Sequence, residues 1–350
     1  MKRTFLFLLL TFAALYAKVT YDIWTANAPE ASLSEGVLSD IAEKVTIVPL
    51  QSATPNSFAG KLRSIRQDGT NLFLINNDIL YRFHISGEFI CRITNPALMK
   101  AAEYVIDPLR KQLIVLGNSD DIYYYTFGGQ LIAKRKPETR LPIQRMQAVT
   151  IYQDCIWTAE ERMRFDLLTN EWLIEQQWVK YDIAFREMES HRLLAANLPN
   201  KPILPFGRHI DIAVEEDTGM IYACSPSLLP DDLLKDSLLL NSGQIFPGLS
   251  SDKDQLLAFP LRFGQRFWLA SSFNPTDAAQ NYIFCFDRTT LRSWQLNAGF
   301  EDDFYHTGRI REWQAMDVYS RRYCFSKSGE EVQHVSRSGA PVIFIVELKA

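Results

Sequence analysis

Two stretches of this chain repeat one short pattern about 41 residues apart, and this repeat constrains the fold more than any other feature. The first reads NLFLINNDILYRFHISGEFICRI, and the second reads KQLIVLGNSDDIYYYTFGGQLIAKRK. Each predicts an apolar strand, a turn rich in Asn and Asp, an aromatic strand, a Gly turn and another strand. The Gly turns fall at Ser86-Gly87 and at Gly128-Gly129. A repeat of this length is typical of solenoids and propellers.

Weaker copies of the pattern follow along the chain. They predict hairpins that turn at Thr169-Asn170, Thr289-Thr290 and Ser328-Gly329. Another short strand is expected upstream of each hairpin, in the segments KLRSIRQ, EYVIDP, RMQAVTIY, HIDIAVEE, RFWLASS and WQAMDVY. About four strands in each of about six units predict an all-β, six-bladed β-propeller with four-stranded blades.

The repeat also suggests where the propeller begins and how it closes. Residues 18–44 form a lead-in without a clear repeat, and we expect that residues 18–40 can be deleted. The propeller is expected over 45–350, with the repeat slipping between about 178 and 260 and an irregular insertion around 225–255. The isolated strands VTIVPL and PVIFIVELK, near the two ends of the chain, are expected to share the closing blade, because this pairing removes a free sheet edge.

The first 17 residues have the layout of a secretory signal peptide. Lys2 and Arg3 precede an apolar run, Thr4–Ala17, which is shorter than the ~20 residues of a transmembrane helix. We expect cleavage after Ala17, no membrane span in the mature chain, and a periplasmic or secreted location. An uncleaved membrane anchor is the alternative.

Composition excludes several classes of function. The 37 Lys and Arg residues are outnumbered by 41 Asp and Glu residues, so the chain lacks the basic surface that nucleic-acid binding needs. The five cysteines contain no CxxC pair, and four lie in apolar strand-like runs, which favours buried small hydrophobes over a metal or redox site. We therefore predict no metal and no cofactor.

Three stretches resemble the secreted bacterial six-bladed β-propeller family, which is related to NHL-repeat propellers. VTIVPLQSATPNSFAGKLRSI is similar to the family's opening, the two Gly-turn segments are similar to its blade hairpins, and GAPVIFIVELK is similar to its last strand, with Ala340 where Asn is usual. The resemblance covers about 45–170 and 255–350 and implies the fold, since most members have no assigned biochemistry. NPALMKAAEYVID replaces the glycine-rich, acidic loop that usually follows the first blade.

Basic residues recur at or just before the first strand of several expected blades. They are Lys61, Arg63, Arg145, Arg208, Arg266 and Arg309. Innermost strands line the central channel of a propeller, so Arg63, Arg145, Arg208 and Arg309 are predicted to converge on one channel mouth and bind a small anion or an acidic glycan there. The alternative is that each cation pairs with a nearby acid or faces solvent.

No catalytic motif is present, but one polar cluster could serve chemistry. In EDDFYHTGRIREW, the carboxylates Asp302 and Asp303 lie close in sequence to His306, and His209 shares a strand face with Asp211. Solvated loop charges are the alternative reading of both. The leading interpretation is an exported, non-catalytic binding or scaffold protein whose partner is a small anion, a glycan or a protein. The alternative is a hydrolase or lyase that acts on a polysaccharide or small ester, with Asp302, Asp303, His306 and His209 as catalytic residues.

Overall fold

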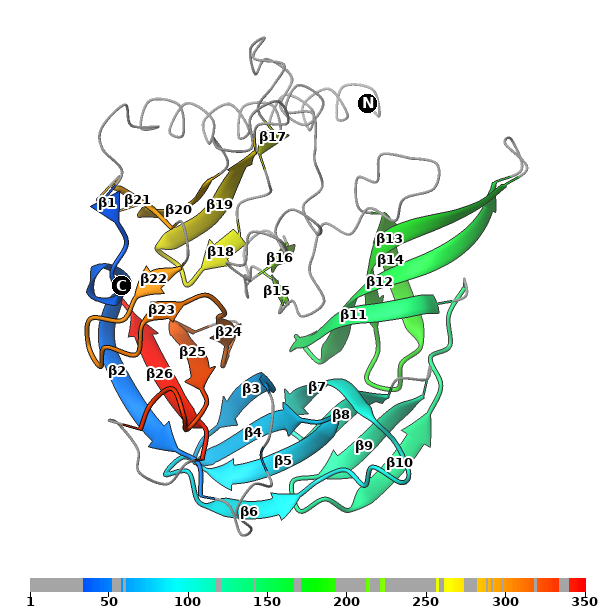
Figure 1. The fold of residues 1–350 in the computed structure, drawn as a ribbon. Coiled ribbons are helices and arrows are strands. Elements are labelled where there is room, and N and C mark those ends of the chain that lie inside the picture. The colour runs from blue at the N-terminus through cyan, green and yellow to red at the C-terminus, as the bar shows by residue number, and fades with distance from the viewer. Residues whose placement is uncertain are drawn as a thin grey trace.

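The computed structural model consists almost wholly of β-strands (Figure 1). It describes residues 34–51, 58, 61–117, 121–140, 143–166, 171–192, 212–214, 221–223, 256–257, 261–273, 282–287, 289–290, 292–296, 299–317, 320–333 and 340–350. Within these ranges the single helix is one turn, α2 (Leu38–Ile41). No helix in this part of the chain has the length and hydropathy that crossing a membrane requires.

The two strongest repeats form two four-stranded antiparallel sheets, as the sequence predicts. Sheet 1 contains β3 (Leu62–Asp68), β4 (Asn71–Asn76), β5 (Ile79–His84) and β6 (Phe89–Arg92). Sheet 2 contains β7 (Ala101–Asp107), β8 (Gln112–Gly117), β9 (Ile122–Thr126) and β10 (Leu131–Arg135). The equivalent turn glycines are Gly87 and Gly129, with φ of +92° and +83°, and both lie in the turns that the sequence predicts.

The next sheets follow the same plan with longer or fewer strands. Sheet 3 contains β11 (Ile143–Tyr152), β12 (Cys155–Asp166), β13 (Glu171–Tyr181) and β14 (Glu187–Arg192). Sheet 4 is a described pair, β15 (Ile212–Val214) and β16 (Ile221–Ala223). The expected insertion around 225–255 lies outside the described residues.

Segments from both ends of the chain complete the remaining sheets. Sheet 5 contains β17 (Leu256–Leu257), β18 (Leu261–Phe263), β19 (Phe267–Phe273), β20 (Tyr282–Asp287), β21 (Ser293–Gln295) and the N-terminal β1 (Ser34–Glu35). Sheet 6 contains β24 (Gln314–Ala315), β25 (Arg322–Lys327), β26 (Val342–Leu348) and β2 (Ala42–Pro49). The antiparallel pairing of β2 with β26 confirms that strands near the two ends of the chain share one sheet.

The prediction of a hairpin that turns at Ser328-Gly329 is wrong about the second strand. β25 does end at Lys327, and a turn follows, in which Glu331 accepts hydrogen bonds from the Ser328 backbone N–H at 2.8 Å and hydroxyl at 2.9 Å. The strand that pairs with β25 is β26 rather than EVQHV. β26 is fully apolar over Val342–Val346, so it fits the centre of a sheet better than the charged segment does.

The sheets are arranged around a common centre, and β3, β7, β11 and β24 are the strands of sheets 1, 2, 3 and 6 that lie toward it (Figure 1). Innermost strands of successive sheets contact one another in the order β24, β3, β7, β11 and β15. This radial arrangement of antiparallel sheets is the architecture of a β-propeller.

Hydrophobic clusters lie between neighbouring sheets, because the central strands are buried on both faces. Along β4, Leu72 and Leu74 pack against sheet 6, whereas Phe73 and Ile75 pack against sheet 2. Alternation of side chains along a strand sends successive residues to opposite faces. A continuous apolar run such as NLFLIN is therefore the expected signature of a strand with a sheet on each side.

The described part of the lead-in, residues 34–44, is part of the core, which contradicts the expectation that the whole of 18–40 can be deleted. β1 adds a parallel strand to β21, and both Leu38 and Ile41 of α2 are completely buried between sheets 5 and 6. Lys349 Nζ donates to the carbonyl oxygens of Ser39 at 2.7 Å and Asp40 at 3.0 Å. The segment was missed because its contacts are made with residues about 250–310 positions later in the chain.

Candidate functional site

Arg63, the first predicted ligand-binding arginine, links sheets 1 and 2. Its Nη2 donates to Asp78 Oδ1 at 2.7 Å and to the Ala101 carbonyl oxygen at 3.3 Å, and its Nη1 donates to the Ala102 carbonyl oxygen at 3.4 Å. The guanidinium group is thus occupied by one carboxylate of its own sheet and two carbonyls of β7. These contacts give Arg63 a role in holding neighbouring sheets together.

Arg309 is also paired with carboxylates. It lies on β23 (Arg309–Ile310), which pairs with β22 (Phe300–Glu301) and precedes the innermost strand β24. Its Nη2 lies 2.5 Å from Glu35 Oε2, and its Nε lies 3.0 Å from Glu301 Oε2. Glu35 belongs to the lead-in, so this pairing, like the position of α2, depends on a segment that shows no repeat.

The other cations of the predicted ring are placed as follows. Arg145 lies on β11, the innermost strand of sheet 3, and Arg208 lies outside the described residues. Lys61 contacts Glu312, which joins the first strand of sheet 1 to that of sheet 6. Arg266 is not at an innermost strand: it lies in the turn between β18 and β19.

Arg266 forms a bidentate ion pair with Asp287 of β20. Its Nε and Nη2 donate to the two carboxylate oxygens, each at 2.7 Å. Burial alone would raise the pKa of Asp287, but hydrogen bonds from Arg266, Thr290 and the Thr289 backbone outweigh it and lower the pKa to about 2. Arg63, Arg309, Arg266 and Lys61 therefore all have acidic partners.

The carboxylates of the predicted catalytic cluster, Asp302 and Asp303, accept hydrogen bonds that hold a turn in place. Asp302 is completely buried, and its two oxygens accept from the backbone N–H groups of Phe304, Tyr305 and Thr307 and from the Thr307 hydroxyl, at 2.6–3.2 Å. Asp303 accepts from the Ser39 backbone N–H at 2.9 Å. These bonds shape the β22–β23 turn and attach it to α2.

The histidine partners do not complete that cluster. His306 lies in the same turn with φ of +55°, is exposed, and its backbone N–H donates to the Asp302 carbonyl oxygen at 3.1 Å. His209 lies outside the described residues. Across the described ranges, no three His, Cys, Asp or Glu side chains are grouped so that they could hold a metal ion. The four described cysteines are free, and Cys224 is outside these ranges.

A buried charged cluster in sheet 3 is likewise explained by packing. Arg162 is completely buried and donates to Glu160 Oε2, Glu187 Oε2 and the Tyr181 hydroxyl, each at 2.8 Å. The Tyr181 and Thr158 hydroxyls donate to Glu160 Oε1 at 2.7 and 2.6 Å. Burial raises the pKa of Glu160, and burial beside that carboxylate raises the pKa of Tyr181. The cluster ties β12, β13 and β14 together and presents no surface to a ligand.

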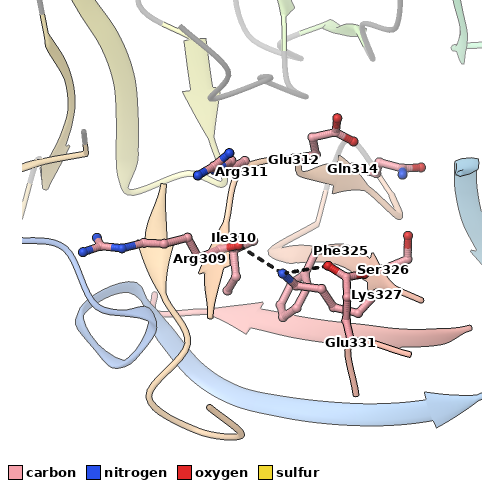
Figure 2. Close-up of a pocket in the computed structure, with 9 residues that line it drawn as sticks. All are labelled: Arg309, Ile310, Arg311, Glu312, Gln314, Phe325, Ser326, Lys327 and Glu331. Atoms are coloured by element: carbon pink, nitrogen blue, oxygen red, sulfur yellow. Dashed lines mark hydrogen bonds and ion pairs between the residues drawn. The ribbon is translucent and has the colours of Figure 1, made fainter. Parts of the chain in front are cut away.

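A cavity of about 440 Å³ opens where β23, β24 and the end of β25 meet (Figure 2). Its charged lining residues are Arg309, Arg311, Glu312, Lys327 and Glu331. The Arg309 side chain points away from the others, toward Glu35, so that residue contributes its backbone to the cavity (Figure 2). We call this space the Lys327 cavity.

Lys327 is the most unusual residue of this cavity. Its side chain is only 13% exposed, and its Nζ donates to the Arg309 carbonyl oxygen at 3.1 Å. The nearest carboxylate oxygen with which it pairs is Glu331 Oε1, at a loose 3.9 Å. An ammonium group has three donors, and a largely buried charge is costly unless it is paired closely. Lys327 therefore has unused capacity to bind a negative group.

The groups around Lys327 are already oriented by other contacts. Burial would raise the pKa of Glu331, but the hydrogen bonds from Ser328 and the charge of Lys327 outweigh it and lower the pKa. Gln314 accepts from the Ile65 backbone N–H at 2.9 Å and donates to the Leu62 carbonyl oxygen at 3.1 Å, which fixes β24 against β3. The cavity is thus built from positioned side chains on paired strands.

No sequence pattern predicted this cavity, although Arg311 and Glu312 lie within the polar segment EDDFYHTGRIREW. Lys327 ends an ordinary-looking strand, and its partners come from Arg309 and from a turn four residues later. A lysine as the last residue of a strand, with Glu at the fourth following position, is a weak signal that many surface turns share.

Comparisons with known proteins leave the function open. No family model matches the chain, and no curated protein matches its sequence. A solved oligogalacturonate lyase in complex with manganese is 11% identical over 91% of this chain and 99% of its own, with a TM-score of 0.42. A nidogen/laminin complex contains a chain that is 10% identical over 73% of this chain and 94% of its own, with a TM-score of 0.38. The Neurospora crassa Pan2 WD40 domain is 7% identical over 83% of this chain and 76% of its own, with a TM-score of 0.31. Similarity at this level transfers neither an activity nor a ligand to this chain.

Proposed function

We propose that this protein is an exported six-bladed β-propeller that binds a small anionic ligand in the Lys327 cavity and does not transform it. The observation that carries the binding role is the largely buried Lys327 ammonium, which among the described residues has one hydrogen bond to a neutral carbonyl and one loose carboxylate partner. A negative group of a ligand would pair with this ammonium more closely than Glu331 does.

Three observations support six blades. Sheets 1, 2 and 3 each have four consecutive strands, and sheet 6 reaches four by adding β2 to β26. Sheet 5 also holds at least four strands, and the β15–β16 pair lies between sheets 3 and 5 in the order of contacts, since β11 contacts β15 and β16 contacts β18. Six such units match the spacing of the sequence repeat.

Export is supported by the charged and apolar layout of the first 17 residues. When the full chain is produced in a Gram-negative host, the periplasmic fraction should contain protein that begins at Lys18. N-terminal sequencing of that fraction checks this. Recovery of the protein only from the cytoplasm, with Met1 intact, would contradict export.

The binding proposal predicts that anions stabilise the protein through Lys327. Thermal unfolding should shift to higher temperature as a small anion such as acetate or sulfate is added, because a ligand that binds only the folded state stabilises it. Lys327→Met keeps the buried stem and removes the charge. It should lower the anion affinity about 10- to 100-fold, since a hydrogen bond to a charged group contributes about 1.5–3 kcal/mol.

Lys136→Met is the matched control, because Lys136 is an exposed lysine outside the cavity. It should leave the anion affinity unchanged, and rising NaCl should weaken binding to the parent protein. Equal affinity in the parent and the Lys327→Met variant would contradict the site. In a separate incubation with a polysaccharide, release of new chain ends would instead favour the alternative of a hydrolase or lyase.

A further inference from the structure

We propose that the outer edge of β10 binds an extended, acidic segment of a partner protein as an additional strand of sheet 2. β10 is the last strand of that sheet and lies at its rim, away from the common centre (Figure 1). Among the described residues, β9 is the only strand that pairs with it, so its other edge has backbone N–H and C=O groups left for another strand. We call this surface, Leu131–Arg135, the β10 edge. It shares no residue with the lining of the Lys327 cavity, and its role does not depend on that site.

Sheet 5 shows that an outer strand of this fold accepts a further strand. β21 is the fourth strand of sheet 5 counted from β18, as β10 is the fourth strand of sheet 2 counted from β7. β1 pairs in parallel with the outer edge of β21, with Glu35 opposite Gln295. The Glu35 carboxylate on this added strand also pairs with the Arg309 guanidinium group. Strand addition combined with an ion pair is therefore already a feature of this molecule.

Aliphatic and basic side chains follow one another along the β10 edge. Leu131 is 50% and Ile132 is 54% exposed, and Lys134 and Arg135 are exposed at the other end of the strand. The register with β9 shifts between Leu131 and Ala133 and is regular from Ala133 to Arg135. A strand that pairs with this edge would cover part of both aliphatic side chains, and burial of apolar surface stabilises such an interface.

Two oriented cations make the β10 edge selective for an acidic strand. Lys134 Nζ lies 2.8 Å from Asp121 Oδ2 and 5.3 Å from the centre of the Tyr123 ring. The Arg135 guanidinium carbon lies 5.7 Å from the centre of the Tyr124 ring, and among the described residues no carboxylate pairs with Arg135. Basic residues on an edge strand discourage pairing with neutral or basic strands, whereas opposite charges across a strand pair are stabilising. A segment with acidic residues opposite the two cations and apolar residues opposite the aliphatic pair meets both requirements.

A second copy of this chain is a poorer occupant of the β10 edge. Antiparallel pairing of β10 with itself would gather the cations of both copies in one short ribbon, and like charges across a strand pair are destabilising. Recognition of an extended segment at a sheet edge is a common way for proteins to bind peptides, with backbone hydrogen bonds giving affinity and side chains giving specificity. We therefore assign the edge to a segment of another protein.

Fluorescence anisotropy with labelled synthetic peptides tests the proposal on the full chain. The first probe is the hexapeptide Glu-Asp-Glu-Val-Thr-Val, whose acidic half lies opposite Lys134 and Arg135 when the pairing is antiparallel. The reverse sequence, Val-Thr-Val-Glu-Asp-Glu, gives the same match when the pairing is parallel. One of the two should bind at least tenfold more tightly than the basic peptide Lys-Lys-Lys-Val-Thr-Val, because the edge repels like charge.

Backbone N-methylation distinguishes strand addition from attraction between charges alone. In an extended strand, alternate N–H groups point to opposite edges. The tighter acidic peptide is therefore N-methylated at every second residue, in each of the two possible phases, which keeps all of its side chains. One phase should lose at least tenfold in affinity because it blocks the donors that face β10, and the other should bind nearly as well as the unmethylated peptide.

Charge-reversal variants locate the site on the molecule. Arg135→Glu should weaken binding of the tighter acidic peptide at least tenfold. Arg92→Glu is the matched control, because Arg92 is an exposed arginine on β6, the outer strand of sheet 1, and this variant should leave the affinity unchanged. Ile132→Ala should weaken binding several-fold by removing an aliphatic contact. Urea unfolding of each variant shows whether it is folded, and the comparison of N-methylated peptides on the parent protein stands without the variants.

The remaining outcomes would each overturn the proposal. One is the absence of binding by either acidic peptide, and another is equal affinity of the two N-methylated forms. Equal effects of Arg135→Glu and Arg92→Glu would place the binding elsewhere. Binding to vesicles of phosphatidylcholine and phosphatidylglycerol, without peptide binding and lost in Arg135→Glu, would assign the edge to a membrane surface. A dimer in analytical ultracentrifugation that changes with Arg135→Glu would assign the edge to a second copy of the chain.

Discussion

A chain that ends at Ala340 is expected to lose cooperative folding altogether, because it lacks β26. This strand lies between β2 and β25 and pairs with both along its length. Its residues Val342, Ile343, Phe344, Val346 and Leu348 are completely buried. Removing a central strand leaves two unpaired edges and exposes the clusters on both faces of sheet 6. Circular dichroism during heating should show no sigmoidal transition, and a transition at the parent temperature would refute the structural role of β26.

The point variant Phe344→Ala should remove part of the same packing and lower the free energy of unfolding by an amount that can be measured. Phe344 stacks on Phe325 with ring centroids 4.7 Å apart and an angle of 2° between the planes. Truncating a buried phenylalanine to alanine costs about 3–5 kcal/mol, so the free energy of unfolding in urea should fall by that amount. Ile132→Ala is the control: Ile132 is 54% exposed on β10, and its truncation should change the free energy by less than about 0.5 kcal/mol.

The variant Gly87→Ala is expected to be strongly destabilising, because two separate constraints require glycine there. Gly87 has a φ of +92°, which side-chain-bearing residues rarely adopt. A Cβ would also lie well inside van der Waals distance of the Pro49 carbonyl oxygen, where the chain leaves β2. The Gln51 backbone N–H donates to the Gly87 carbonyl oxygen at 2.8 Å, so the turn cannot move away without breaking this link between sheets 6 and 1.

Gly69→Ala separates the two constraints. Gly69 also has a positive φ, +57°, but a Cβ there would meet no atom within 4 Å. The free energy of unfolding of this variant should fall only by the backbone strain of an alanine at positive φ, about 1–2 kcal/mol. Gly87→Ala should lower the free energy of unfolding by clearly more than Gly69→Ala in the same urea titration. Equal losses in the two variants would mean that the contact with Pro49 does not hold the sheets together.

The sheets were predictable wherever the local pattern determines them. Sheets 1 and 2 have central strands that are continuously apolar, flanked by Asn, Asp and Gly turns, and every strand of both sheets lies where the repeat places it. The pattern was less informative where strands are short. Arg266 was assigned to an innermost strand because β18, only three residues long, carries no recognisable alternation.

The candidate site was less predictable, because side-chain contacts do not follow the repeat. Arg63 looked available for a ligand, yet its partners include two carbonyls of the next sheet. Asp302 looked reactive beside His306, yet four donors of its own turn satisfy it. The sequence pattern did not single out Lys327, although in the structure it is largely buried beside a carbonyl oxygen and a loosely placed Glu331.

The sequence by itself determined the strand pattern, the period of the repeat and the glycine turns, because these depend on side-chain alternation and on φ values within a few residues. Only the tertiary structure decided which strand lies beside β25, why α2 is buried and which cations already have partners. Those outcomes depend on contacts between residues that are far apart in the chain, such as Lys349 with Ser39 and Arg309 with Glu35. The binding properties of a charged side chain are set by such contacts, because a nearby carboxylate turns a free cation into a structural ion pair.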